Sequence, residues 1–202
     1  MKRTLPAASF ALAAIFACSV QAQTASQPKA NPPGSTSASQ PGAAQSGAPS
    51  QPKSIANQDK NFIEEAAQAN MAEISTGKLA LSKATSGEVK KYAQLMIDEH
   101  SKNLQELQAV AQAKGVKLPD APNKAQMAKA KTLEGLSGAA FDQRYMQDVG
   151  IEEHRKAVAL FKKGASSKDP DVRAYAEKTL PHVEQHLKMA QQNSPKKVAA
   201  VR

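Results

Sequence analysis

Four ionisable side chains lie in or beside the apolar stripes of four long helical segments of this chain: Glu73, His100, Glu153 and His186. A charged or polar group is costly to bury unless it is paired, hydrogen-bonded or bound to a metal. Helices of one bundle direct their apolar stripes at a common interior. The spacing therefore predicts a polar cluster inside a helical bundle, and this cluster is the one site-like feature of the sequence.

A mononuclear metal site is one interpretation of the cluster, because imidazole and carboxylate groups bind divalent transition metals such as Zn, Cu, Ni or Fe. The candidate ligands are Glu73, His100, Glu153, His154 and His186. The other interpretation is a structural Glu–His hydrogen-bond network, since isolated polar residues on an apolar stripe usually find such partners. The sequence favours the structural network, and it establishes no cofactor.

The spacing of the histidines does not favour a dinuclear iron site of the ferritin type. Such a site needs a Glu-x-x-His motif on each of two helices. The residues three positions before the four histidines are Ile97, Ile151, Thr179 and Val183. The remaining histidine, His182, is next to Pro181 and is expected at the surface.

No residue pattern supports an enzyme. Nucleophilic hydrolysis needs an activated serine or cysteine beside a base, and the only cysteine is Cys18, near the amino terminus. No serine lies in a Gly-x-Ser-x-Gly turn, and no glycine-rich phosphate loop follows a strand. We therefore assign no catalytic residues and expect a non-enzymatic protein.

Helical periodicity positions the polar residues. At about 100° per residue, apolar stripes predict long helices that begin near residues 57, 85, 137 and 169, with a shorter helix over residues 123–134. Thr85 and Glu88 have the spacing of a capping box. Four such helices predict an all-α four-helix bundle over residues 57–193, with either an up-down-up-down or a ferritin-like connection. In the third long helix, the stripe includes Glu153 and leaves His154 toward one edge.

The first 22 residues have the features of a secretory signal peptide. Lys2 and Arg3 precede an apolar stretch, and Val20-Gln21-Ala22 has the pattern of a cleavage site. We therefore expect an exported, periplasmic protein whose mature chain has no transmembrane span. In a minority interpretation, the residues up to Cys18 form a loose lipobox, and Cys18 carries a lipid anchor.

The two ends of the chain differ in composition from the helical part. Residues 23–56 are rich in Ser, Pro, Ala and Gln and are expected to form a disordered linker, and residues 194–202 form a basic tail. The net charge of +9 resides mainly in these ends. A nearly neutral bundle without tryptophan excludes nucleic acid as a partner. An envelope component or another protein remains as the partner class, and the sequence defines no oligomeric state.

Five short motifs occur in order along the helical part. They are Asp59-x-x-Phe62, Glu73-Ile74-x-x-Gly77-Lys78-Leu79-Ala80, Met96-Ile97-x-x-His100-x-x-Asn103, Phe141-Asp142-x-x-Tyr145 followed by His154, and Leu180-Pro181 followed by His186-Leu187. Together they resemble the bacterial exported ferritin-like domain of unknown function 4142 family, whose members are often labelled predicted outer membrane proteins. The resemblance covers residues 57–192. It implies a ferritin-like bundle and export, and it brings no established activity.

These observations predict a non-enzymatic bundle of the periplasm or cell envelope. It would act as an envelope accessory protein or as a stress-related binding module. One alternative is a metal-binding bundle with a mononuclear His/Glu site. Another is an envelope scaffold or adhesion module, which rests only on the linker and the basic tail.

Overall fold

The computed structural model describes residues 55–194. The expected signal peptide, Cys18, the linker up to residue 54 and the basic tail from residue 195 lie outside this range. Every regular element within residues 55–194 is helical, which confirms the all-α prediction. None of the helices in this range is long and apolar enough to cross a membrane.

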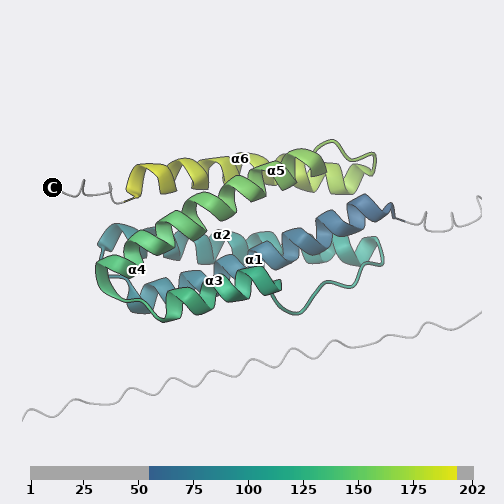
Figure 1. The fold of residues 1–202 in the computed structure, drawn as a ribbon. Helices are drawn as coiled ribbons and strands as arrows, with labels where there is room; N and C mark the ends of the chain where they lie inside the picture. Colours follow the sequence, from purple (N-terminus) through teal and green to yellow (C-terminus); the bar gives the residue numbers. More distant parts are fainter. Residues whose placement is uncertain (1–54, 195–202) are drawn as a thin grey trace, which may run out of the picture. The chain divides into compact units, whose positions relative to one another are not determined.

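Four long helical stretches and one shorter helix form the structure (Figure 1). The stretches are α1 (Asn57–Lys83), α2 (Gly87–Ala113), the continuous run of α4 (Gly138–Tyr145), η1 (Met146–Glu153) and α5 (His154–Gly164), and finally α6 (Pro170–Asn193). The shorter helix, α3 (Lys124–Glu134), lies between α2 and α4 in the sequence.

The long helices close a four-sided bundle with a ferritin-like connection. Helix α1 packs on α2, α2 on α6, α6 on α5, and α5 on α1. In Figure 1, α2 and α5 run in the same direction, and each is antiparallel to α1 and α6. The chain passes from α2 to α4 through a loop and α3, which packs along α1. A single long crossover between two helical hairpins is the ferritin-like arrangement, so the structure selects this connection over up-down-up-down.

The start of α2 differs from the capping box predicted at Thr85. The cap is Ser86, whose Oγ accepts from the backbone N–H of Val89 at 3.5 Å. The hydroxyl of Thr85 instead donates to Asp142 Oδ2 at 2.8 Å. Asp142 also accepts from the backbone N–H groups of both residues. A carboxylate from α4 therefore fixes the turn between α1 and α2, and a contact between distant segments has replaced the local cap.

The third long stretch contains a π-helix, η1, where the sequence predicted continuous α-helix. A π-helix joins residues five apart rather than four, so it turns through a smaller angle per residue. Its residue Gly150 lies against α6, where a Cβ atom on Gly150 would be 2.8 Å from the Cβ of Ala190. Because of its smaller angle per residue, the π-helical turn shifts the helix face on which every following side chain lies.

Two apolar clusters fill the bundle, and a polar layer separates them. The first cluster surrounds Tyr92, Met96 and Tyr145, and the second surrounds Phe62 and Phe161. On each long stretch, buried polar residues lie between the positions that belong to the two clusters, namely Asn70, Glu73, His100, His154 and His186. The fold therefore brings the predicted polar residues together midway along the bundle.

Candidate metal centre

Three histidines from three helical elements meet in the polar layer. His100 lies in α2, His154 begins α5 and His186 lies in α6. Their exposed fractions are 5%, 1% and 3%. One ring nitrogen of each histidine lies within 4.8 Å of one ring nitrogen of each of the others. We call these three residues the histidine triad.

Each ring of the triad donates a hydrogen bond to an oxygen outside it. His100 Nδ1 is 2.7 Å from Asn70 Oδ1, His154 Nδ1 is 3.1 Å from the carbonyl oxygen of Val149, and His186 Nε2 is 2.8 Å from Glu99 Oε2. Carbonyl, amide and carboxylate oxygens only accept, so the proton of each neutral ring is on its outer nitrogen. The inner nitrogen of each ring then carries a lone pair.

The orientation of Asn70 is fixed by a chain of side-chain hydrogen bonds. Asn103 Nδ2 donates to Asn70 Oδ1 at 3.4 Å, and Thr179 Oγ1 donates to Asn103 Oδ1 at 3.3 Å. The amide oxygen of Asn70 therefore points at His100. The chain joins α1, α2 and α6, so three helices hold the ring of His100 in place.

The inner nitrogens have no hydrogen-bond partner among the described residues. They are His100 Nε2, His154 Nε2 and His186 Nδ1, all buried. Burial without a partner is costly for a polar atom, and each of these three nitrogens carries a lone pair. A cation with empty coordination positions would satisfy all three.

Burial also keeps the triad neutral. It lowers the pKa of His100 well below its ordinary value, and the neighbouring rings of His154 and His186 lower it further. It lowers the pKa of His154 to about 4, although the bond to the Val149 carbonyl acts in the opposite direction. The pKa of His186 is also lowered by burial, against the effect of Glu99. Neutral imidazole is the form that binds metals.

Glu73 lies beside the triad rather than in it. This residue of α1 is 5% exposed, and its Oε1 is 3.7 Å from His154 Nδ1, the outer nitrogen of that ring. Its other oxygen has no partner among the described residues. Burial, followed by the charge of Glu153, raises the pKa of Glu73 well above its ordinary value. The carboxyl group therefore lies behind His154, in the position of a group that orients a ligand.

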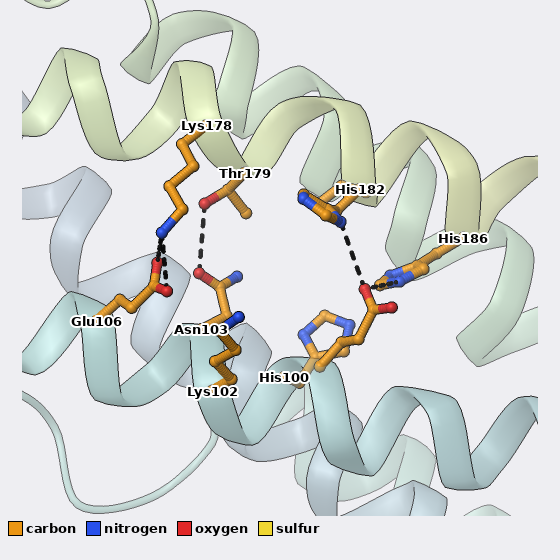
Figure 2. A pocket seen from close by; sticks show the side chains of 10 residues that line it. His100, Lys102, Asn103, Glu106, Lys178, Thr179, His182 and His186 are labelled. Atoms are coloured by element: carbon orange, nitrogen blue, oxygen red, sulfur yellow. Dashed lines mark hydrogen bonds and ion pairs between the residues drawn. The ribbon is translucent and has the colours of Figure 1, made fainter.

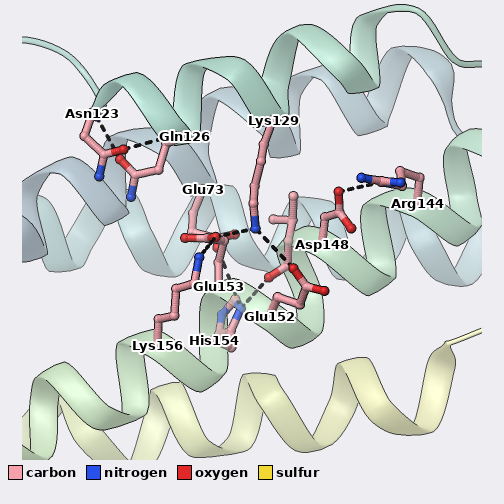
Figure 3. Close-up of polar contacts among 11 residues, drawn as sticks. Glu73, Asn123, Gln126, Lys129, Arg144, Asp148, Glu152, Glu153, His154 and Lys156 are labelled. Carbon is pink, nitrogen blue, oxygen red and sulfur yellow. Dashed lines mark hydrogen bonds and ion pairs between the residues drawn. The ribbon is translucent and has the colours of Figure 1, made fainter.

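Glu153 does not join the cluster. Its Oε1 accepts from Lys129 Nζ at 2.6 Å and from Lys156 Nζ at 2.8 Å, as Figure 3 shows. Burial acts to raise the pKa of Glu153, but the hydrogen bonds from these two lysines outweigh it and the pKa is lowered. The predicted stripe had Glu153 inside and His154 at its edge. The π-helical turn η1 exchanges the two, because a constant angle of about 100° per residue does not hold across it.

Two further residues of the site carried no usable signal in the sequence. Glu99 precedes His100 and would be assigned to the exposed face of a regular helix, yet it reaches across to His186. Val149 contributes only its carbonyl oxygen, which no side-chain pattern reveals. Asn70 could have been identified from the sequence, because it lies one helical turn before Glu73 on the same apolar face of α1.

The fourth histidine, His182, is at the surface of α6. Its side chain is 60% exposed, and its Nδ1 is 3.6 Å from Glu99 Oε2. Figure 2 shows His182 and His186 turned toward the same carboxylate.

The triad has the ligand types and surroundings of a mononuclear transition-metal site. A tetrahedral ion with metal–nitrogen bonds of about 2.0 Å holds its nitrogens about 3.3 Å apart. One ring nitrogen of each histidine lies within 4.8 Å of one ring nitrogen of each of the others, so metal binding would draw the three rings inward. An oxygen acceptor on the outer nitrogen of each ring is the usual arrangement around metal-binding histidines.

Two solved structures are similar to this chain. One is a DUF305 fragment from Deinococcus radiodurans, with 13% identity, a TM-score of 0.62, and coverage of 69% of this chain and 97% of that chain. The other is CopM in the Cu(II)-bound form, with 20% identity, a TM-score of 0.54, and coverage of 66% and 93% respectively. At these identities the likeness concerns the fold.

No curated protein matches the sequence. The family described as domain of unknown function (DUF4142) matches residues 43–192. This match spans the whole bundle, including all three histidines of the triad. The chain therefore belongs to the DUF4142 family.

Proposed function

We propose that this protein is an exported metal-binding bundle that holds one divalent transition-metal ion between His100, His154 and His186. The observation that carries the proposal is the orientation of the three rings. Each donates its only proton to an oxygen outside the triad, and its second, bare nitrogen is buried without a partner among the described residues. The expected signal peptide supports a location in the periplasm.

A purely structural Glu–His network accounts less well for this geometry. In such a network, buried polar atoms are paired with one another. Here the inner nitrogens of the triad and Glu73 Oε2 lack partners among the described residues. The inner nitrogens carry no proton, so the arrangement favours a cation beside them. We therefore prefer the metal site to the structural hydrogen-bond network that the sequence favoured.

Copper(II) is the ion that we expect to bind most tightly. Imidazole ligands suit Cu(II), Zn(II), Ni(II) and Fe(II), and among these divalent ions Cu(II) forms the most stable complexes with a given nitrogen site. The triad contains no sulfur ligand, which makes Cu(I) less suitable. CopM was solved with Cu(II) bound, so a bundle of similar fold can carry this ion.

Binding or buffering of the ion fits the site better than catalysis does. Two carboxyl groups lie next to the triad, Glu73 by the outer nitrogen of His154 and Glu99 by the outer nitrogen of His186. Neither contacts an inner nitrogen, so both are poorly placed to act as a general base on a metal-bound molecule. A scaffold or adhesion role has less support, because within residues 55–194 the only large apolar side chain that is exposed is Met127, at 46%.

Metal titration of the exported protein, purified without a histidine tag, tests the proposal. We expect one Cu(II) per chain, measured by elemental analysis and by competition with a chelator of known affinity. His100→Gln should weaken binding by more than about a hundredfold, because loss of a ligand exceeds the 10–100-fold cost of losing an orienting group. His182→Gln is the matched control and should bind Cu(II) as tightly as the wild type. Failure of the wild type to bind, or equal affinity of His100→Gln, would refute the site.

A further inference from the structure

A pocket of about 180 Å³ leads from the surface between α2 and α6 to the triad (Figure 2). Two triad members, His100 and His186, line it, together with Glu99 and His182. The inner nitrogens of both triad members are buried and unpartnered among the described residues. The pocket therefore leads from solvent to the rings of two of the three triad histidines.

Three potential ligands in this pocket form a gradient of exposure. The side chain of His182 is 60% exposed, that of Glu99 is 39% exposed and that of His186 is 4% exposed. Glu99 Oε2 is 3.6 Å from His182 Nδ1 and 2.8 Å from His186 Nε2. One carboxylate oxygen is therefore within reach of both an exposed and a buried imidazole.

The other charges of this pocket do not compete for Glu99. Lys178 Nζ lies 2.8 Å from Glu106 Oε2, so these two side chains neutralise each other at the far end of the pocket. Lys102 also lines the pocket, and no ion pair joins it to Glu99 in the structure of residues 55–194. Glu99 consequently presents its negative charge to the two histidines, where it attracts cations.

A second, larger pocket of about 390 Å³ reaches the triad from the side of α1, α3 and α5. It also contains ionisable side chains, but Glu153 in its lining is already bound by Lys156. The histidines that line it, His100 and His154, are both buried. It offers no exposed imidazole from which an ion could be passed inward.

We propose that a hydrated divalent cation reaches the triad through the α2–α6 pocket, captured first by His182 and Glu99 and then transferred to His186 and His100. This inference rests on the proposed function. Stepwise exchange between neighbouring ligands lets the ion shed its water without being left uncoordinated at any point. A transit site of this kind changes rates and leaves the final affinity unchanged, because it belongs to neither the free nor the fully bound state.

Stopped-flow mixing of the exported protein with Cu(II) tests the route. The chain has three tyrosines and no tryptophan, and quenching of tyrosine fluorescence by Cu(II) reports binding. His182→Ala should lower both the association and the dissociation rate by the same factor, about tenfold, which is the lower end of steering effects, with an unchanged Kd. Glu99→Gln should lower the association rate and also raise the Kd, because Glu99 orients His186.

The matched control is the double variant Glu106→Gln with Lys178→Gln, which alters the same pocket without changing its net charge. It should bind Cu(II) at the wild-type rate. An unchanged association rate in His182→Ala, with normal binding at equilibrium, would overturn the route and leave the proposed function intact. A raised Kd in His182→Ala would also overturn it, because His182 would then be a ligand of the bound state. A wild-type protein that binds no Cu(II) would refute the proposed function itself.

Discussion

His154 Nδ1 lies 3.1 Å from the carbonyl oxygen of Val149, five residues earlier in the chain. This spacing is that of the π-helical turn η1, in which residues five apart come together. The irregular turn thus both directs His154 into the bundle and supplies the acceptor that holds its ring. π-helical turns are frequent at functional sites, and here the turn accounts for the position of His154 in the triad, which regular helix geometry would not have predicted.

Gly150→Ala should destabilise the protein and weaken metal binding. A Cβ on Gly150 would lie 2.8 Å from the Cβ of Ala190, which is fully buried on α6 one turn beyond His186. Such overpacking typically costs about 1–3 kcal/mol, and a shift of α6 would move His186 away from the triad. Urea denaturation measures the free energy of unfolding. Gly87→Ala is the control, because nothing lies within 4 Å of a Cβ there. Wild-type stability in both variants would show that η1 and α6 leave room for a methyl group at position 150.

Stability should fall in acid because of His154. The pKa of this histidine is about 4 in the folded protein and about 6.5 in an unfolded chain. Its contribution is complete above pH 6.5 and is lost as the pH falls toward 4, because only the unfolded state takes up the proton in that range. The loss is on the order of 3 kcal/mol. Thermal melts of the metal-free protein between pH 8 and pH 4 should show it, and a flat midpoint would contradict the burial of a neutral triad.

Glu73 should contribute a pH dependence of stability opposite in sign to that of His154, and Glu73→Gln should remove it. The pKa of Glu73 is raised by burial, so the folded state favours the protonated acid and loses stability as the pH rises above the ordinary range of a glutamate. Removal of this group should make the variant more stable than the wild type at pH 8, with the difference shrinking toward pH 4.5. Chemical denaturation at both pH values measures the difference. Glu177→Gln, at an exposed position of α6, should show no such trend.

Asn70→Leu should reduce metal affinity without removing a ligand. The change deletes the acceptor of His100 Nδ1, so the ring loses its fixed tautomer, and loss of such an orienting group costs about 10–100-fold in affinity. Asn70→Asp retains an oxygen at the same position and should bind metal at least as tightly as the wild type. Competition titration with a chromophoric chelator distinguishes the two. Equal losses in both variants would mean that Asn70 acts through packing.

Glu153→Gln should leave metal binding unchanged. The carboxylate contacts Lys129 and Lys156 rather than the triad, and such partly exposed ion pairs contribute about 0–1 kcal/mol. We expect the stoichiometry and Kd for Cu(II) to match the wild type, with a small loss of stability at most. A large loss of affinity in this variant would restore Glu153 to the site.

The sequence predicted the helices well because their boundaries are encoded locally. Asp169 caps α6 through the backbone N–H groups of Asp171 and Val172, as a residue before proline at a helix start is expected to do. The cap of α2 was assigned one residue too early, because Thr85 is drawn to Asp142, 57 positions away in the chain. Local patterns determine helices, whereas contacts between distant segments select among the local options.

The sequence predicted the buried helix faces of His100 and His186 but not the faces on which Glu153 and His154 lie. His100 and His186 follow regular helices, and the structure brings both into the polar layer. Glu153 and His154 come directly at the end of a π-helical turn, and no periodicity calculated for regular helix assigns them to the correct faces. The acceptors Glu99 and Val149 are defined by the mutual position of helices, which a single sequence does not contain.

The polar layer divides the core of the bundle into two apolar clusters. Aromatic rings are in contact within each half, Phe62 with Phe161 at one end and Phe141 with Tyr145 at the other. Between them, packing by apolar side chains gives way to histidines that repel one another. An ion bound at this level would join α2, α5 and α6 in the layer where apolar packing is interrupted. If the triad binds a metal as proposed, the stability of the bundle would depend on the concentration of metal around it.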